Sequence, residues 1–269
     1  MLLLRLSIGF LVMLVHCVQS HKISKYTVLS YHFIHQSIFI QYHQVMGCTE
    51  SLPEKSCYTV PHPIDSKFKP IGLHVNAGPS SGSTPTTFVV KEKFFSWSGD
   101  DFKLKHYPTG QPLGNGLKIK GKVFALRDQM TLLDGNGQMV AVLLRKFQVI
   151  GQTFKIYVSK PVYEGQPPSQ QKYEAQNLYT YCEIRRVPLS TTQEIVMDGK
   201  TTPDYTVTRA GAFWPKSRLV KRNGQPAALM EGGTWEGAFN SYKITCCPGI
   251  DPCLMALVCA ACDEMDEDK

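Results

Sequence analysis

The cysteines are the residues of this sequence that most invite a chemical interpretation. The chain has nine, and five of them lie in its last 24 residues: Cys246, Cys247, Cys253, Cys259 and Cys262. The last two have the Cys-x-x-Cys spacing of a zinc site. However, no histidine follows His106, and this pair belongs to an apolar segment, where free cysteine usually packs as a small hydrophobic residue. We therefore expect buried thiols here and no bound metal.

No other group of residues points to catalysis or to a cofactor. The segment DGNG at residues 134–137 has the residue types of a calcium loop, but an EF-hand needs glycine and glutamate where this chain has Met139 and Arg145. The segment is instead typical of a hairpin turn. Three histidines beyond residue 45 lie near no nucleophile motif of known spacing, and they are His62, His74 and His106. We therefore expect a protein that is not an enzyme.

A lipidation signal lies inside the sequence. Residues 46–51, MGCTES, match the start of an N-myristoylated protein, because glycine follows methionine and a serine stands four positions later. Myristoylation requires a free N-terminus, so this interpretation places the start of translation at Met46. One myristoyl chain anchors a protein only weakly, and Cys48 is placed to carry a palmitoyl chain as the second anchor. The predicted lipidation sites are therefore Gly47 and Cys48.

Residues 1–20 support a different start. Arg5 followed by an apolar run over residues 8–15 is typical of a cleaved secretory signal. Cleavage would remove Cys17 and leave eight cysteines, an even number that disulfides would tolerate. Against secretion, the cysteines crowd at one end of the chain, and no asparagine is a glycosylation acceptor. The sequence therefore favours a cytoplasmic, membrane-associated protein, with a secreted protein as the alternative.

Composition divides the chain into four parts. Residues 1–45 form a doubtful extension or signal-like segment without acidic residues, and residues 46–85 are rich in proline, glycine and serine, which predicts a flexible arm. Residues 86–265 form the compact domain, and residues 266–269 form an acidic tail. The net charge is +7, but residues 1–45 contribute three of the 29 basic residues, so the rest has 26 against 22, or +4. This balance does not suggest nucleic acid as a partner.

The compact domain has the pattern of an all-β protein. Short segments rich in β-branched and aromatic residues alternate with turn signals every 8–12 residues or so, as in sandwiches and barrels. Residues 132–143 align with 219–230 at an offset of 87, and residues 153–156 align with 241–244 at an offset of 88. Two related halves that share one core predict a closed antiparallel β-barrel.

The segment after Gly249 predicts a helix. Asp251 can accept hydrogen bonds from the first free N–H groups, and Pro252 suits the first helical position. Residues 253–262 have no polar face, so this helix must be buried on every side. It is too short to span a bilayer, which takes about 20 residues. The inside of a barrel surrounds a helix completely, so we expect a central helix.

Four stretches resemble the LURP-one-related family, which belongs with the tubby C-terminal domains and the phospholipid scramblases. They are FSWSGDDF at residues 95–102, GKVFALRDQM at 121–130, VAVLLRK at 140–146 and the apolar helix that ends in DEM at 263–265. The first is the most specific. The resemblance covers about residues 86–265 and implies a closed barrel of about twelve strands around a central C-terminal helix. It does not imply catalysis.

The resemblance also suggests what the basic residues do. Tubby relatives bind phosphoinositide headgroups, and arginine makes bidentate contacts to phosphate. The predicted headgroup-binding residues are Arg145, Lys146, Arg185, Arg186, Lys216, Arg218, Lys221 and Arg222. The alternative is that these charges only face solvent. The expected partners are a membrane phosphoinositide or other anionic lipid, or a signalling protein, and scramblase-like lipid handling is the alternative activity.

Overall fold

The computed structural model describes residues 58–91, 102–122, 129–146, 152–210, 217–235 and 238–267. These belong to one compact unit, Glu50–Lys269. The signal-like segment, the lipidation sites Gly47 and Cys48 and the predicted headgroup residue Lys216 lie outside the described residues.

The protein is mainly β, as the sequence predicts. Thirteen strands form one antiparallel sheet in the order β2-β4-β5-β6-β7-β10-β11-β12-β13-β14-β15-β1-β3. The strands are β1 (Thr86–Lys91), β2 (Phe102–Lys103), β3 (Lys105–His106), β4 (Lys118–Lys122), β5 (Gln129–Leu133), β6 (Met139–Lys146), β7 (Thr153–Val158), β10 (Tyr179–Arg186), β11 (Gln193–Met197), β12 (Tyr205–Arg209), β13 (Arg218–Arg222), β14 (Gln225–Trp235) and β15 (Ala238–Cys246). A second, small sheet pairs β8 (Lys172–Tyr173) with β9 (Gln176–Asn177).

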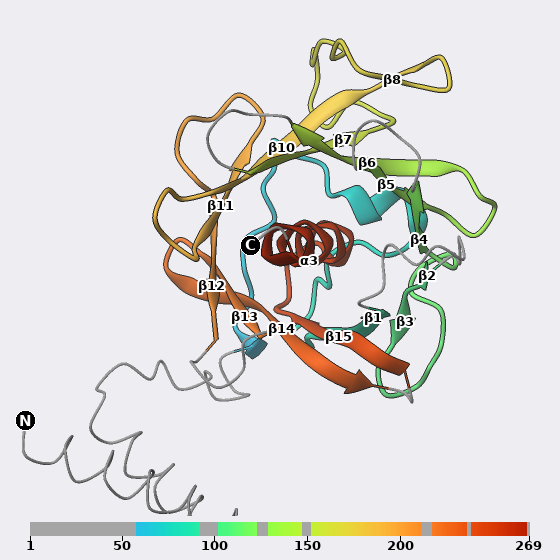
Figure 1. The fold of residues 1–269 in the computed structure, drawn as a ribbon. Coiled ribbons are helices and arrows are strands. Elements are labelled where there is room, and N and C mark those ends of the chain that lie inside the picture. Colours follow the sequence, from blue (N-terminus) through green and yellow to red (C-terminus); the bar gives the residue numbers. More distant parts are fainter. Residues whose placement is uncertain are drawn as a thin grey trace, which may run out of the picture. The chain divides into compact units, whose positions relative to one another are not determined.

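The two edge strands of the large sheet, β2 and β3, are neighbours in the sequence. β2 and β3 are separated only by Leu104, and the described hydrogen bonds do not join β2 to β3. Counted as one extended segment, β2 and β3 would give 13 − 1 = 12 strands. In Figure 1 the strands are arranged around helix α3, with β2 and β3 next to each other on one side.

Helix α3 (Pro252–Glu267) confirms the predicted C-terminal helix and continues just past the DEM segment at residues 263–265. It begins after Asp251, whose Oδ1 accepts a hydrogen bond of 2.9 Å from the N–H of Cys253. Residues 253–262 are at most 1% exposed. Figure 1 shows the reason, because the helix lies inside the ring of strands. A helix without a polar face is stable in this environment.

The repeat in the sequence corresponds to a repeat in strand pairing. The hairpins β5–β6 and β13–β14 are each followed in the sheet by one more strand, β7 or β15. Leu143 of β6 lies opposite Ile156 of β7, and the aligned Met230 of β14 lies opposite Ile244 of β15. The DGNG segment is a turn, in which Asp134 Oδ1 accepts the N–H groups of residues 136 and 138. The two aligned segments therefore fold alike.

Residues 58–85 differ from the flexible arm that the sequence predicts. They include the 3₁₀ helix η2 (Ile71–Val75), and several of their apolar side chains join the main core: Tyr58, Phe68, Ile71, Val75 and Ala77. The N–H of His62 donates to the carbonyl of Pro248 at 2.8 Å, and the N–H of Gly249 donates to the carbonyl of Ser80 at 2.9 Å. The packed structure therefore extends at least to Tyr58, because this segment covers the chain just before α3.

Candidate functional site

Strand pairing places five of the predicted headgroup-binding residues at one end of the sheet. Arg145 and Lys146 end β6, and Arg185 and Arg186 end β10; Lys146 and Arg185 both lie opposite Thr153 of β7. Arg218 begins β13, opposite Arg209 at the end of β12. The C-terminal end of α3 also lies here, because Arg186 and Arg218 both contact it. Lys221 and Arg222 lie at the other end of β13.

Two of these arginines hold the helix in place. Arg218 is 1% exposed and its Nη2 donates to the carbonyl of Cys262 at 3.1 Å and to Asp266. Arg186 donates to the carbonyl of Met265 at 2.8 Å and pairs with Asp266. Arg209, which the sequence analysis missed, pairs with the same carboxylate at 3.2 Å. Cations at the C-terminal end of a helix satisfy its last carbonyls and favour its dipole, so this cluster has a structural role.

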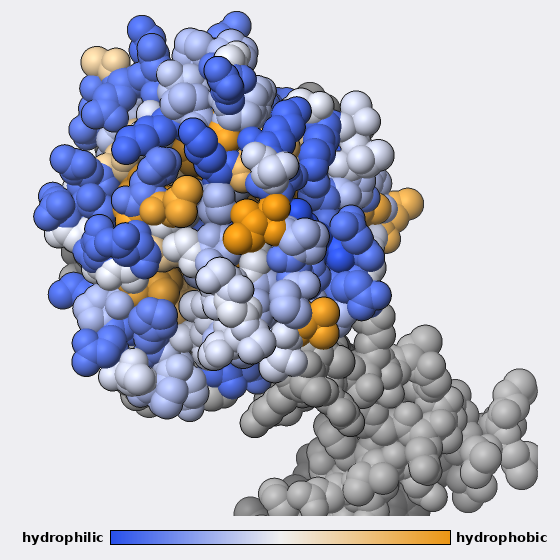
Figure 2. All heavy atoms as spheres, turned by 180° about the vertical axis from the view of Figure 1, so that it is seen from behind, coloured by the Kyte–Doolittle hydropathy of each residue, from blue (hydrophilic) through white to orange (hydrophobic). Residues whose placement is uncertain are grey.

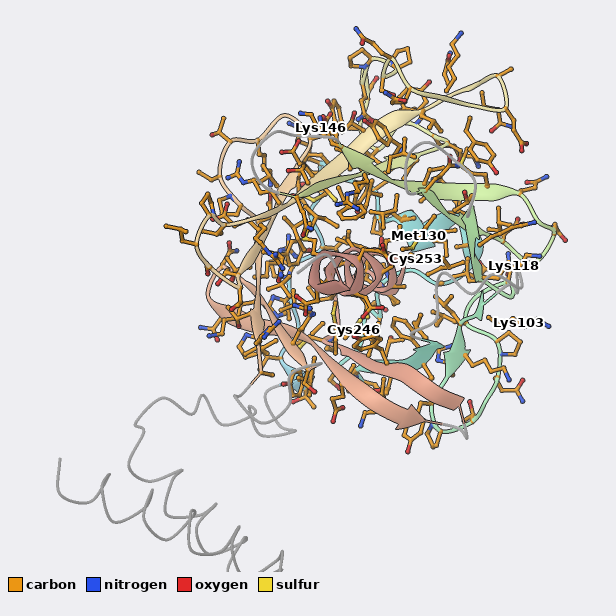
Figure 3. The ribbon with its side chains drawn as sticks, viewed as in Figure 1. Lys103, Lys118, Met130, Lys146, Cys246 and Cys253 are labelled. Carbon is orange, nitrogen blue, oxygen red and sulfur yellow. The ribbon has the colours of Figure 1, made fainter. Side chains whose placement is uncertain are left out.

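Four more of the predicted residues that the structure describes also interact within the protein. Arg185 donates from Nε and Nη2 to Glu194 at 3.0 and 2.8 Å, and Arg222 donates to the carbonyl of Pro63 at 2.6 Å. Arg145 and Lys221 also interact within the protein. Lys146 is exposed, and Figure 3 shows it at the periphery on β6. The predicted residues therefore do not gather as eight free charges on one surface.

A second group of basic residues lies on β2, β3 and β4, and the sequence analysis did not single it out. We call Lys103, Lys105, Lys118 and Lys120 the lysine face. They alternate with Leu104, Leu117 and Ile119, which are fully buried. Because successive strand residues point to opposite sides, the lysines point outward. Figure 3 shows Lys103 and Lys118 on the outer side of the strands, whereas Met130 of β5 lies on the inner side, toward Cys253 of α3.

The lysine face is built by the pairing of β2, β3 and β4 with their neighbouring strands, and Lys118 also interacts within the protein. Lys103 lies opposite Lys118, and the partners of the other positions are uncharged: Val89 for Lys105, Leu133 for Lys118 and Thr131 for Lys120. Like charges directly opposite each other in a sheet are destabilising. Four lysines on one side of neighbouring strands give this face a positive potential, which attracts anions. The signal was present in the sequence, in the alternating lysines of FKLKHY and LKIKGK.

A polar groove continues from the lysine face. Lys120 lines it together with Lys160, Tyr173, Glu174 and Gln176, and its open volume is about 640 Å³. This is within the usual range of ligand sites, roughly 300 to 1,000 Å³. Figure 2 shows that hydrophilic residues dominate the face seen from behind and that hydrophobic residues there form small, separate areas. The surface thus offers charge and hydrogen bonds to a ligand more than apolar contact.

The described cysteines are buried and free, as the sequence predicts. They are Cys182, Cys246, Cys247, Cys253, Cys259 and Cys262. Burial raises the pKa of Cys182 and of Cys253, so these thiols stay protonated. Within the described ranges, no three histidine, cysteine or acidic side chains are grouped closely enough to hold a metal ion. None of the described helices has the length and apolar character needed to cross a bilayer.

A comparison with protein families gives a clear result. A family model described as LURP-one-related matches residues 86–263. The chain belongs to the LURP-one-related family. The match begins at the first residue of β1 and ends in the last turns of α3, so it covers the whole large sheet and most of the helix. No curated protein matches the chain.

Proposed function

We propose that this LURP-one-related protein is a non-enzymatic binding protein that attaches to anionic membrane lipids, phosphoinositides among them, through its lysine face. The observation that supports the proposal is the position of four lysines on the outer side of neighbouring strand segments, where Lys103 lies opposite Lys118, and Lys105 and Lys120 flank this pair. Each lysine near an anionic membrane surface contributes about 1 kcal/mol, so four contribute about 4 kcal/mol, or roughly a thousandfold in affinity.

The proposed architecture is a tubby-like barrel closed by a single segment. One strand made of β2, Leu104 and β3 would join β4 on one side to β1 on the other. This closure would place Lys103 and Lys105 on the outer surface of one continuous wall, next to Lys118 and Lys120. A closed wall would also keep water from the unbroken apolar surface of α3.

The proposed attachment includes acylation at Gly47 and palmitoylation at Cys48. A single acyl chain gives only reversible binding, and a basic surface is a suitable second signal. The family relationship and the free, buried thiols support the view that the protein works at the cytoplasmic side of a membrane, because thiols stay reduced there.

Sedimentation with vesicles tests the proposal. The full chain is mixed with phosphatidylcholine vesicles, with or without a phosphoinositide. We expect the double variant Lys103→Gln/Lys120→Gln to bind phosphoinositide vesicles about 30-fold more weakly, since two charges of about 1 kcal/mol each are lost. The matched control is Lys146→Gln/Arg185→Gln, which removes two charges at the far end of the sheet and should change binding less than threefold or so.

The control also decides between the two basic regions. A large loss of binding for Lys146→Gln/Arg185→Gln, with Lys103→Gln/Lys120→Gln unchanged, would move the site to the end of the sheet that the sequence predicted and overturn the lysine face. Equal binding to vesicles with and without phosphoinositide would overturn the proposed function itself.

A further inference from the structure

A small pocket lies where the segment of residues 58–85 meets the sheet. It is formed by η2, the turn after β5, the start of β6 and the end of β7. Its open volume is about 100 Å³, against a liquid-water share of ~30 Å³ per molecule, so it has room for a group of a few heavy atoms. Its polar lining includes two cations, Lys69 and Lys160, and the imidazole of His74, from three different parts of the chain.

The charges around this pocket favour an anion. Burial lowers the pKa of His74, and the positive charges of Lys160 and Lys69 lower it further, which shows that both lysines act on the imidazole. Neither lysine forms an ion pair with any residue that the structure describes. Asp134 is the carboxylate of this pocket, and its Oδ1 already accepts two N–H groups of its own turn. Two lysines against one carboxylate leave the pocket with an excess of positive charge.

The pocket opens beside the polar groove. Gln138, Met139, Ser159 and Lys160 line both, so Lys160 stands at their junction. Beyond it, the groove presents the hydroxyl group of Tyr173, the carboxylate of Glu174 and the amide of Gln176. These groups can donate to and accept from hydroxyl groups. The two hollows together suit a ligand that has an anionic end and a hydroxylated body.

We propose that this pocket binds the phosphate of a phosphomonoester, with Lys69, His74 and Lys160 around the phosphate and a polyol body in the groove. Such a ligand is either a soluble polyol phosphate or the headgroup of a lipid. Lysine and histidine are suitable donors to phosphate oxygens, and hydrogen bonds between charged groups are roughly twice as strong as neutral ones. This site is separate from the lysine face in its phosphate-binding residues and shares only Lys120, at the far side of the groove.

The pocket also predicts a dependence on pH. Near pH 7 the imidazole of His74 is largely neutral, because burial and then the charges of Lys160 and Lys69 lower its pKa. A dianion bound between the three side chains would offset these charges and raise the pKa of His74. Asp134 also lines the pocket, on the turn after β5. Binding should therefore take up a proton and become tighter as the pH falls from 8 to 6.

Calorimetric titration of the full chain with glycerol 3-phosphate tests the inference. Lys69→Gln/Lys160→Gln should bind at least about tenfold more weakly, because two charged donors are lost. Lys146→Gln, which removes an exposed lysine outside both the pocket and the lysine face, should bind within about twofold of the unchanged chain. Sulfate keeps its double charge between pH 6 and 8, so tighter sulfate binding at pH 6 reports on His74, and His74→Gln should abolish that difference.

Vesicles separate the two sources of the phosphate. Phosphatidylcholine vesicles that contain phosphatidic acid present a phosphomonoester on a lipid, whereas glycerol 3-phosphate presents it in solution. Weaker binding of either probe by Lys69→Gln/Lys160→Gln supports the site. The probe that is affected shows whether the phosphate belongs to a lipid or to a soluble molecule. If both probes bind the variant and the unchanged chain equally, or bind neither, the inference is wrong. The proposed function is still supported after that result if Lys103→Gln/Lys120→Gln binds phosphoinositide vesicles more weakly than the unchanged chain does.

Discussion

Asp251 joins two elements through a buried carboxylate. Its Oδ1 accepts the N–H of Cys253 at the start of α3, and its Oδ2 accepts the N–H groups of Ile71 and Gly72 in η2. Burial raises its pKa from 3.8 to about 6, although these backbone hydrogen bonds act in the opposite direction. The folded protein thus holds a proton more tightly at Asp251 than the unfolded chain does. Through this group, stability is greatest below pH 3.8 and is lost as the pH rises toward 6.

The variant Asp251→Asn isolates this effect, because asparagine can still cap the helix but does not titrate. We expect the free energy of unfolding of the unchanged chain, relative to the variant, to fall by about 2 kcal/mol between pH 4.5 and pH 7.5. Urea unfolding of both proteins at these two pH values measures the difference. The same difference at both pH values would show that Asp251 titrates normally.

At the scale of elements, the contact between residues 58–85 and the start of α3 depends on one glycine. Gly249 has a φ of +82°, and a Cβ atom placed on it would lie 1.9 Å from the carbonyl oxygen of His62. Gly199 has a φ of +71°, but a Cβ atom there would meet nothing within 4 Å. Both Gly→Ala variants strain the backbone by a similar amount, so their difference measures the clash alone.

We expect Gly249→Ala to lower the free energy of unfolding by at least about 2 kcal/mol more than Gly199→Ala. The reason is that the backbone around His62 must move away from the new methyl group. We also expect limited proteolysis to cleave residues 58–85 faster in Gly249→Ala only. Urea unfolding and mass spectrometry of the digests provide the two measurements. Equal loss of stability in both variants, with equal cleavage, would mean that this contact contributes little.

The elements also show what the sequence can and cannot predict. The strands, the two hairpins and α3 depend on local patterns, so the alternation of side chains and the capping residues at Asp251 and Pro252 are enough. The packing of residues 58–85 is different, because its anchors Phe68 and Ile71 are few and meet partners far along the chain. Composition rich in proline and glycine predicts flexibility and does not report such contacts.

The basic residues illustrate the same limit. Their positions at the ends of β6, β10 and β13 become neighbours only through the pairing of strands that are far apart in sequence. Nothing local shows that Arg218 points inward to the end of α3 while Lys146 is exposed. The lysine face was predictable, since period-two alternation of lysine with apolar residues already indicates a strand with one charged side.

At the scale of the whole molecule, one core joins the sheet, α3 and residues 58–85. Its six buried cysteines belong to β10, to α3 and to the end of β15 with the residue after it. Their reactivity therefore shows whether the core is open at each of these elements. Because burial raises the pKa of Cys182 and Cys253, the native protein exposes no reactive thiolate at these positions. Reaction with a thiol reagent therefore requires that the core opens.

If the core unfolds as one cooperative unit, all six cysteines should become reactive at the same urea concentration, together with the loss of β-sheet circular dichroism. Pulse labelling with iodoacetamide at increasing urea, followed by peptide mass spectrometry, measures each cysteine separately, and labelling in high urea gives the maximum for each site. Reaction of Cys253, Cys259 and Cys262 before Cys182 would show that α3 leaves the sheet in a separate step. We do not expect that step, because α3 has no polar face and its whole apolar surface would be exposed to water.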